Sequence, residues 1–107
     1  MPLTQNREVQ SIDMMPGVSR KTMTAGDRMM LIEVTLAVGA VVPMHTHPHE
    51  QTGYLVSGRL RFQLGDDTHD LAPGDTWMIP GDLPHEVTAL ERSLVIDVFS
   101  PPREEYR

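Results

Sequence analysis

The sequence predicts an all-β fold, built as a sandwich or barrel of short strands. Nine prolines and eight glycines divide the 107 residues into short segments. These segments are rich in β-branched and other apolar residues, which is typical of strands. No stretch carries a capped apolar stripe at the 3.6-residue period of a helix, so no long helix is expected.

Alternation of apolar and polar residues defines the expected strands. Residues 29–37 and 59–64 both place an apolar side chain at every second position, which is typical of a strand with one buried face. The first 25 or so residues are less patterned, although residues 18–23 can form an edge strand. The other expected strands, bounded by glycine and proline turns, are residues 54–57, 68–71, 76–79, 85–90 and 93–99.

The length and charge of the chain limit what it can be. A chain of 107 residues predicts one domain, with its core at about residues 17–100 and a polar C-terminal arm at residues 101–107. A net charge of -6 argues against nucleic acid as a partner. The chain has no cysteine, which excludes disulfides, thiolate ligands and cysteine nucleophiles. We find no signal peptide and no segment long enough to span a membrane, so we expect a cytoplasmic protein without membrane contact.

Three histidines and a glutamine form a candidate metal site. His45 and His47 lie two residues apart in an extended segment, so both side chains point to the same side and can bind one metal ion. Gln51 begins the next apolar run, and His85 can approach from a neighbouring strand. The alternative is that these are scattered surface histidines.

The glycines and prolines around these residues resemble the two motifs of the cupin family. From Gly39 to Gly58 the sequence reads as glycine, five residues, H-x-H, three residues, glutamine, six residues, glycine. From Gly74 to His85 it reads as glycine, five residues, proline and glycine, with the histidine four residues after that glycine. The resemblance implies a single cupin domain, a double-stranded β-helix also described as a jelly-roll barrel. A cupin of this kind holds one divalent transition metal, and imidazole and amide ligands accept Zn, Ni, Co, Fe or Mn.

Several residues depart from the cupin pattern. Gln51 occupies the position where a glutamate is usual, and Glu50 lies one residue out of register. Asp82 and Ala89 stand where a glycine and an asparagine are common. Because all four ligands are neutral, the metal keeps its full charge and is a stronger Lewis acid. The site also lacks the two-histidine, one-carboxylate set of iron(II) oxygenases, which weighs against a dioxygenase.

The last expected strand carries an aspartate among apolar residues. Both faces of residues 93–99 are apolar apart from Asp97, so we expect the strand to be buried on both sides. A buried charge is costly unless it is paired or functional. We favour Asp97 and Phe99 pointing into the barrel near the metal. In the other interpretation Asp97 forms an ion pair, for which the candidates are Arg59, Arg61 and Arg103.

Two segments, HPHEQ and DVFSPPRE, are similar to the uronate ring-opening cupins of pectin and alginate breakdown (the KdgF type). The likeness runs from about Gly17 to Tyr106. It implies an enzyme that opens 4,5-unsaturated uronate monosaccharides, so the partner is a small anionic sugar. The metal ligands it implies are His45, His47, Gln51 and His85, and the catalytic residues are Asp97, Phe99 and Arg103.

These residues suit the expected reaction. Asp97 can shuttle a proton, and Arg103 can hold the sugar carboxylate in a bidentate fork. Phe99 and Trp77 can form walls against the sugar, although Trp77 fits a hydrophobic core at least as well. His49 is expected to be a loop or supporting residue, and His69 to be exposed.

Other functions and the oligomeric state stay open at this point. The alternatives are another cupin metalloenzyme, either a dioxygenase or an isomerase, and a sugar-binding cupin without catalysis. An exposed edge strand near the N-terminus suits exchange between two chains, so we expect a homodimer.

Overall fold

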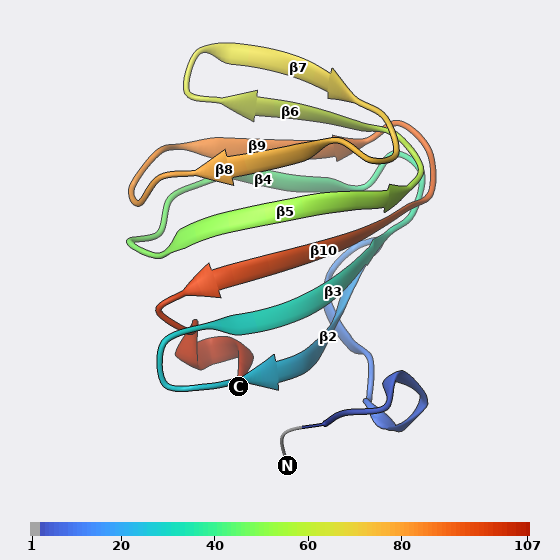
Figure 1. Cartoon of the computed structure of the whole chain (residues 1–107). Helices are drawn as coiled ribbons and strands as arrows, with labels where there is room; N and C mark the ends of the chain where they lie inside the picture. Colours follow the sequence, from blue (N-terminus) through green and yellow to red (C-terminus); the bar gives the residue numbers. More distant parts are fainter. Residues whose placement is uncertain (1–2) are drawn as a thin grey trace.

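The computed structural model describes residues 3–107, which form ten strands in two antiparallel sheets (Figure 1). The larger sheet has the order β1-β2-β3-β10-β5-β8, and the smaller has the order β4-β9-β6-β7. Within these residues the helical elements are two short 3-10 turns, η1 (Asn6–Glu8) and η2 (Glu104–Tyr106). No helix among them is long and apolar enough to cross a membrane. The strands are β1 (Ile12–Met15), β2 (Val18–Ala25), β3 (Met30–Leu36), β4 (Val41–His45), β5 (Glu50–Ser57), β6 (Leu60–Leu64), β7 (Asp67–Leu71), β8 (Thr76–Ile79), β9 (His85–Ala89) and β10 (Ser93–Ser100).

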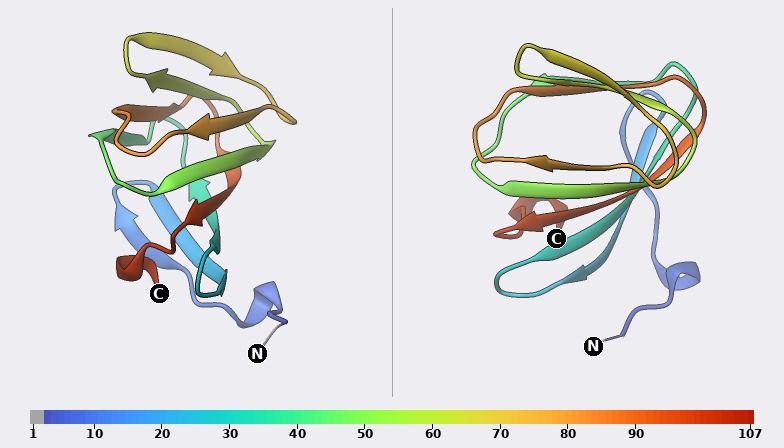
Figure 2. Two further views of the ribbon diagram at one scale, coloured as in Figure 1. Left: turned by 60° about the vertical axis from the view of Figure 1, so that its left-hand side comes forward. Right: turned by 45° about the horizontal axis from the view of Figure 1, so that its top comes forward.

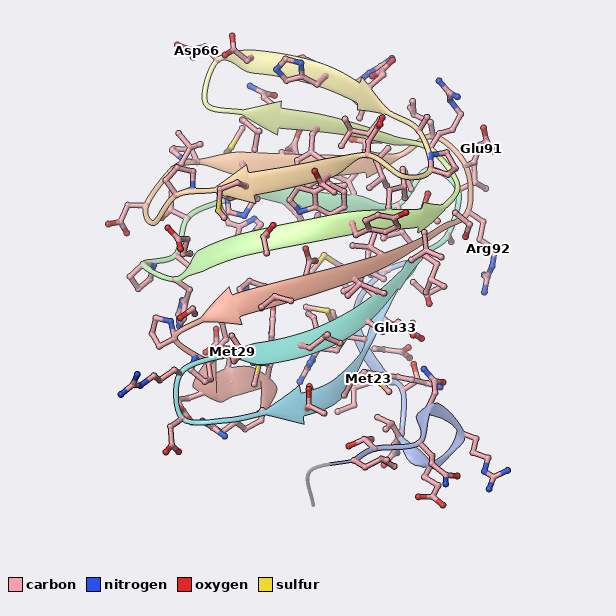
Figure 3. All side chains as sticks on the ribbon, in the orientation of Figure 1. Met23, Met29, Glu33, Asp66, Glu91 and Arg92 are labelled. Carbon is pink, nitrogen blue, oxygen red and sulfur yellow. The ribbon has the colours of Figure 1, made fainter. Side chains whose placement is uncertain are left out.

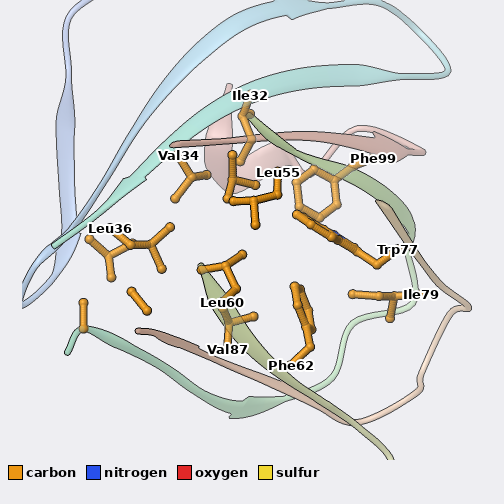
Figure 4. Close-up of a cluster of buried hydrophobic side chains, with 14 of the residues drawn as sticks. Ile32, Val34, Leu36, Leu55, Leu60, Phe62, Trp77, Ile79, Val87 and Phe99 are labelled. Carbon is orange, nitrogen blue, oxygen red and sulfur yellow. The ribbon is translucent and has the colours of Figure 1, made fainter. Parts of the chain in front are cut away.

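The two sheets curve around a common interior, which the turned views show as a barrel (Figure 2). Each inner face is built by the two-residue period of its strands. In β3, for example, Met30, Ile32, Val34 and Leu36 are buried while the residues between them are half-buried. Side chains from both sheets meet in one core, in which Ile32 and Leu55 face Leu60 and Phe62 (Figure 4). The predicted all-β barrel is confirmed.

Two strands were not expected from the sequence pattern, and both lie at sheet edges. β4 contains Pro43 and has no clean alternation, but it pairs only with β9, and its register shifts between Val42 and His45. An irregular edge strand is where proline is tolerated. The strand expected at residues 18–23 is present as β2, but it is not an edge strand, because it lies between β1 and β3. The edge of the larger sheet is β1.

β10 lies in the middle of the larger sheet, between β3 and β5. Its inner residues Val95, Asp97 and Phe99 are buried, whereas its outer residues are half-buried. The expectation that the strand is buried on both faces is therefore wrong. Only the inner face of a two-sheet barrel meets the core, whereas the outer face of this sheet meets the short N-terminal segment, in which Asn6 is hydrogen-bonded to Glu33 and Lys21.

The outside of the barrel carries charged side chains at its loops and exposed apolar residues on part of the larger sheet. Charged side chains such as Asp66 and Glu91 stand at the turns that connect the strands (Figure 3). The outer face of the larger sheet instead exposes Tyr54, Val56 and Met78.

The C-terminal tail, which we expected to be a polar arm, is docked on the barrel. Pro102 is buried, and Arg103 and Tyr106 are half-buried. The end of the tail also contacts the barrel, because the Arg107 guanidinium donates a hydrogen bond of 2.9 Å to the carbonyl of Gly26. A proline and a tyrosine that pack inward among charged residues account for this docking.

Candidate metal centre

Three histidine rings meet at one end of the barrel interior. His45, at the end of β4, is the register partner of His85, at the start of β9, and their ring centroids are 4.1 Å apart. His47 lies in the loop that follows β4, with its ring centroid 4.9 Å from that of His85. One nitrogen from each ring lies within 4.8 Å of the others. The three rings therefore form a cluster that can hold a metal ion.

Backbone carbonyl groups set the orientation of all three rings. The Nδ1 atoms of His45, His47 and His85 lie 2.7, 3.0 and 2.8 Å from the carbonyl oxygens of Pro43, His49 and Leu83, respectively. A carbonyl only accepts, so each Nδ1 carries the proton and each Nε2 is left with a lone pair. This is the arrangement by which protein groups orient the histidine ligands of metals.

The Nε2 atoms themselves are placed to bind a cation. Nε2 of His85 is buried and has no hydrogen-bond partner among the described residues, and such orphaned groups are rare in folded proteins. Nε2 of His47 faces the side-chain oxygen of Gln51 at 3.0 Å. Two acceptors at that distance repel each other unless a proton or a cation lies between them. The donor set therefore fits a divalent metal ion.

Burial favours the neutral form of His47 and His85, which is the form that binds metals. Burial is the main cause that lowers the pKa of His85 to about 4. The pKa of His47 is also lowered, first by burial and then by the positive charge of Arg103. Protonation of these two residues therefore does not compete with a metal at neutral pH.

Gln51 connects the histidines to Asp97. Gln51 lies on the inner face of β5, beside Phe99 of β10 in the register. Its amide nitrogen donates a hydrogen bond of 3.0 Å to Oδ1 of Asp97, which turns the amide oxygen towards His47. A glutamate here would have no proton to donate and would repel the Asp97 carboxylate. The neutral Gln51 thus lets Asp97 stand beside the cluster.

Asp97 points into the barrel, as we favoured. Its Oδ1 also accepts a hydrogen bond of 3.2 Å from the indole nitrogen of Trp77. Burial raises the pKa of Asp97 to about 6, against the opposite effects of the two hydrogen bonds and of Arg103. The ion pair that we considered is absent among residues 3–107: Arg59, Arg61 and Arg103 pair with Glu91, Asp70 and Glu105.

Trp77 belongs to both the core and the site. Its ring packs against Phe62, with centroids 4.8 Å apart, and it lines the same cavity as Asp97. A Cβ atom at Gly53 would overlap the Trp77 ring, so only glycine fits opposite it. The sequence indicated a core role or a sugar wall but gave no sign of the hydrogen bond to Asp97.

Phe99 and Arg103 also border this cavity, which lies between the histidines and the apolar core. The Phe99 ring meets the His47 ring edge-on, with centroids 5.6 Å apart. The Arg103 guanidinium lies 5.2 Å from the centroid of Phe99. The structure thus gathers every residue that the sequence singled out for the site. Tyr106, which also lines the cavity, was missed because nothing local to the tail marks it.

Of the two remaining histidines, His49 borders the cluster and His69 lies away from it. His49 contributes its backbone carbonyl to His47, and its own ring is 5.6 Å from the His47 ring. It is therefore a supporting loop residue, as expected. His69 is exposed on β7, also as expected.

The fold and the site define the class of this protein: the chain belongs to the cupin family, whose domain model matches residues 32–99. Within that family it is similar to the pectin degradation protein KdgF of Dickeya dadantii, with 34% identity over 92 residues and 84% of each chain covered. The structure of KdgF from a Halomonas species superposes with a TM-score of 0.94 at 36% identity, covering 98% of this chain and 97% of that one. An RmlC-like cupin from Shewanella frigidimarina has the same TM-score at 24% identity, covering 98% and 95%, which shows the shared fold. The predicted resemblance is confirmed.

Proposed function

We propose that this protein is a metal-dependent cupin enzyme that opens the ring of 4,5-unsaturated uronate monosaccharides from pectin or alginate breakdown. One observation carries the proposal: Gln51 links the Asp97 carboxyl directly to the histidine cluster inside a cavity. A relative at 34% identity is a pectin degradation protein, and pectin is a polymer of uronates. The metal is one of Zn, Ni, Co, Fe or Mn.

The chain has residues suited to hold an anionic sugar. The net charge of -6 does not attract an anion, so the positive charge must be local. Arg103 supplies it at the cavity, where its planar guanidinium can hold a carboxylate through two hydrogen bonds. A divalent metal held by His45, His47, Gln51 and His85 would stabilise negative charge that develops on the sugar oxygens.

Asp97 is suited to move the proton that ring opening requires. Both N–H donors, from Gln51 and Trp77, bind Oδ1, which leaves Oδ2 for the exchange. Oδ2 accepts the proton of the anomeric hydroxyl, the bond from the anomeric carbon to the ring oxygen breaks, and its electron pair stays on the ring oxygen as an enolate. Asp97 then returns the proton to C4, which gives the linear keto form. A carboxyl with a pKa of about 6 can both accept and release a proton near neutral pH.

The test is the ultraviolet absorbance of the 4,5-unsaturated uronate that a lyase releases from pectin, because ring opening and ketonisation remove its conjugated double bond. Metal-loaded protein is expected to accelerate the decay of this absorbance above the spontaneous rate. Decay at the spontaneous rate, with the metal content verified by elemental analysis, would show that the proposal is wrong.

Asp97→Asn separates an enzyme from a sugar-binding cupin. The amide keeps the size of the side chain but cannot accept the proton, so the rate is expected to fall about 100-fold or more. If the wild-type protein binds the uronate but does not accelerate its ring opening, and Asp97→Asn therefore changes no rate, the protein is a sugar-binding cupin without catalysis.

A further inference from the structure

The docked C-terminal segment closes one side of the cavity with an aromatic ring. Tyr106, in η2, lines the cavity together with Arg103 and Phe99. Its ring meets the Phe99 ring edge-on, with centroids 5.9 Å apart. Tyr106 therefore belongs to the same wall as the residues that face the histidines.

Two arginines fix the position of the Tyr106 ring. The guanidinium carbon of Arg103 lies 4.2 Å from the ring centroid, and that of Arg20, from β2, lies 4.5 Å from it. Both distances are within the range of cation–π attraction. The backbone is held as well, because the hydroxyl of Thr22 donates to the carbonyl of Tyr106 and Arg20 donates to the carbonyl of Glu105 at 3.4 Å.

Arg20 has no other evident purpose in the fold. Its Nε is buried without a hydrogen-bond partner among the described residues, and none of the ion pairs between them includes it. A partly buried arginine without a carboxylate partner lowers stability. Its contacts with Tyr106 and Glu105 account for its position.

The hydroxyl of Tyr106 is available to a ligand. It makes no hydrogen bond within residues 3–107. Burial raises the pKa of Tyr106, so the hydroxyl keeps its proton at neutral pH and can donate it to a sugar oxygen.

We propose that Tyr106 is a further substrate-contacting residue, which donates a hydrogen bond from its hydroxyl to the sugar, and that Arg20 is the residue that positions it. The proposal rests on the proposed function, because it takes the occupant of the cavity to be a uronate monosaccharide. Arg20 is not among the residues that line the cavity, so it acts through Tyr106.

The first test compares Tyr106→Ala, Tyr106→Phe and the control Tyr54→Ala, which removes the other tyrosine from the exposed outer sheet face. Kinetics with the 4,5-unsaturated uronate are combined with calorimetric binding of saturated D-galacturonate to metal-loaded protein. Tyr106→Ala is expected to raise KM and to weaken galacturonate binding about tenfold, with kcat changed less than about threefold. Tyr106→Phe is expected to weaken binding about threefold, and Tyr54→Ala to leave it unchanged. Galacturonate binding as tight as that of the wild type in Tyr106→Ala would overturn the proposal. If Tyr106→Ala does not fold, binding as tight as that of the wild type in Tyr106→Phe would overturn it.

The second test is a double-mutant cycle between Arg20 and Tyr106. Arg20→Met is expected to weaken galacturonate binding about threefold, and Arg20→Lys to restore part of the loss because it keeps the positive charge. Arg20→Met added to Tyr106→Ala should cause no further loss. Additive losses would mean that Arg20 acts on the sugar directly, which would overturn its positioning role.

Binding and turnover separate this inference from the proposed function. Wild-type protein that binds galacturonate but does not accelerate the loss of absorbance would refute the enzyme, while the binding of the variants would still decide the role of Tyr106. Wild-type protein that binds no galacturonate would overturn this inference.

Discussion

The two ends of the barrel interior are built from the same strands but differ in polarity. At one end β5 and β10 contribute Leu55 and Val95, which are almost fully buried and apolar. At the other end the same two strands contribute Gln51 and Asp97, which are also buried. The apolar end has the composition that stabilises a fold. The polar end buries groups that cost stability unless they find partners, so we infer that it is retained for chemistry.

A cavity at the apolar end should have the largest effect on stability. Leu60→Ala removes a side chain with no exposed surface, so we expect a loss of about 2–5 kcal/mol in the free energy of unfolding. Urea denaturation of the metal-free protein measures this loss. The exposed Leu3→Ala serves as the control and should change stability by less than about 0.5 kcal/mol. Equal losses in the two variants would contradict the assignment of this end as the core.

The polar end should respond to pH in two opposing ways. The pKa of Asp97 is raised from its ordinary value of 3.8 to about 6, so the native state binds its proton more tightly than the unfolded state does. The contribution of Asp97 to the free energy of unfolding is therefore fully present below about pH 4. This contribution, about 3 kcal/mol, is lost as the pH rises through about 6. The pKa of His85 is lowered from 6.5 to about 4, so its effect has the opposite sign: stability is lost as the pH falls from 6.5 through 4.

The effect of Asp97 opposes that of His85 and of His47, whose pKa is also lowered, so the stability of metal-free wild-type protein is expected to change little between pH 4 and pH 6.5 compared with that of Asp97→Asn. Asp97→Asn removes the opposing effect, and its stability should therefore rise with pH more steeply than that of the wild type across this range. Urea denaturation at a series of pH values tests this. If the stability of Asp97→Asn depends on pH in the same way as that of the wild type, the pKa of Asp97 is not raised in the native state.

Loss of a histidine should affect metal binding more than folding. His85→Ala is expected to weaken metal binding about 100-fold or more, measured by competition with a chelator. A chelator should lower the melting temperature of wild-type protein, because a ligand present at 100 times its Kd stabilises by about 2.7 kcal/mol. The same chelator should not shift the melting temperature of His85→Ala. His69→Ala, on exposed β7, is the matched control and should bind metal normally.

The outer face of the larger sheet differs from the buried inner face, because it exposes apolar side chains. Tyr54, Val56 and Met78 are 48%, 40% and 55% exposed there, and exposed apolar groups that adjoin one another are typical of an interface. We predict a homodimer in solution. Light scattering should give twice the chain mass of 12.0 kDa, and Met78→Glu should shift the equilibrium towards the monomer if this face is the interface. A wild-type mass near 12.0 kDa would contradict the dimer.

Much of the fold and the site could be predicted because short-range rules govern both. The two-residue period placed the buried residues of β3 correctly and put Asp97 and Phe99 on the same face. It also put His45 and His47 on one side of an extended segment. β4 escaped prediction because Pro43 and a register shift break its alternation, and β1 because four residues are too few to show a period.

The sequence by itself determined the strands, the face of each residue and the types of ligand in the candidate site, because these depend on neighbours within a few residues. Only the tertiary structure decided that His85 lies opposite His45, that Trp77 donates to Asp97 and that Tyr106 enters the cavity wall. Such contacts join residues far apart in the chain and depend on which strands become neighbours. The raised pKa of Asp97 has the same origin, because it follows from burial by the whole barrel.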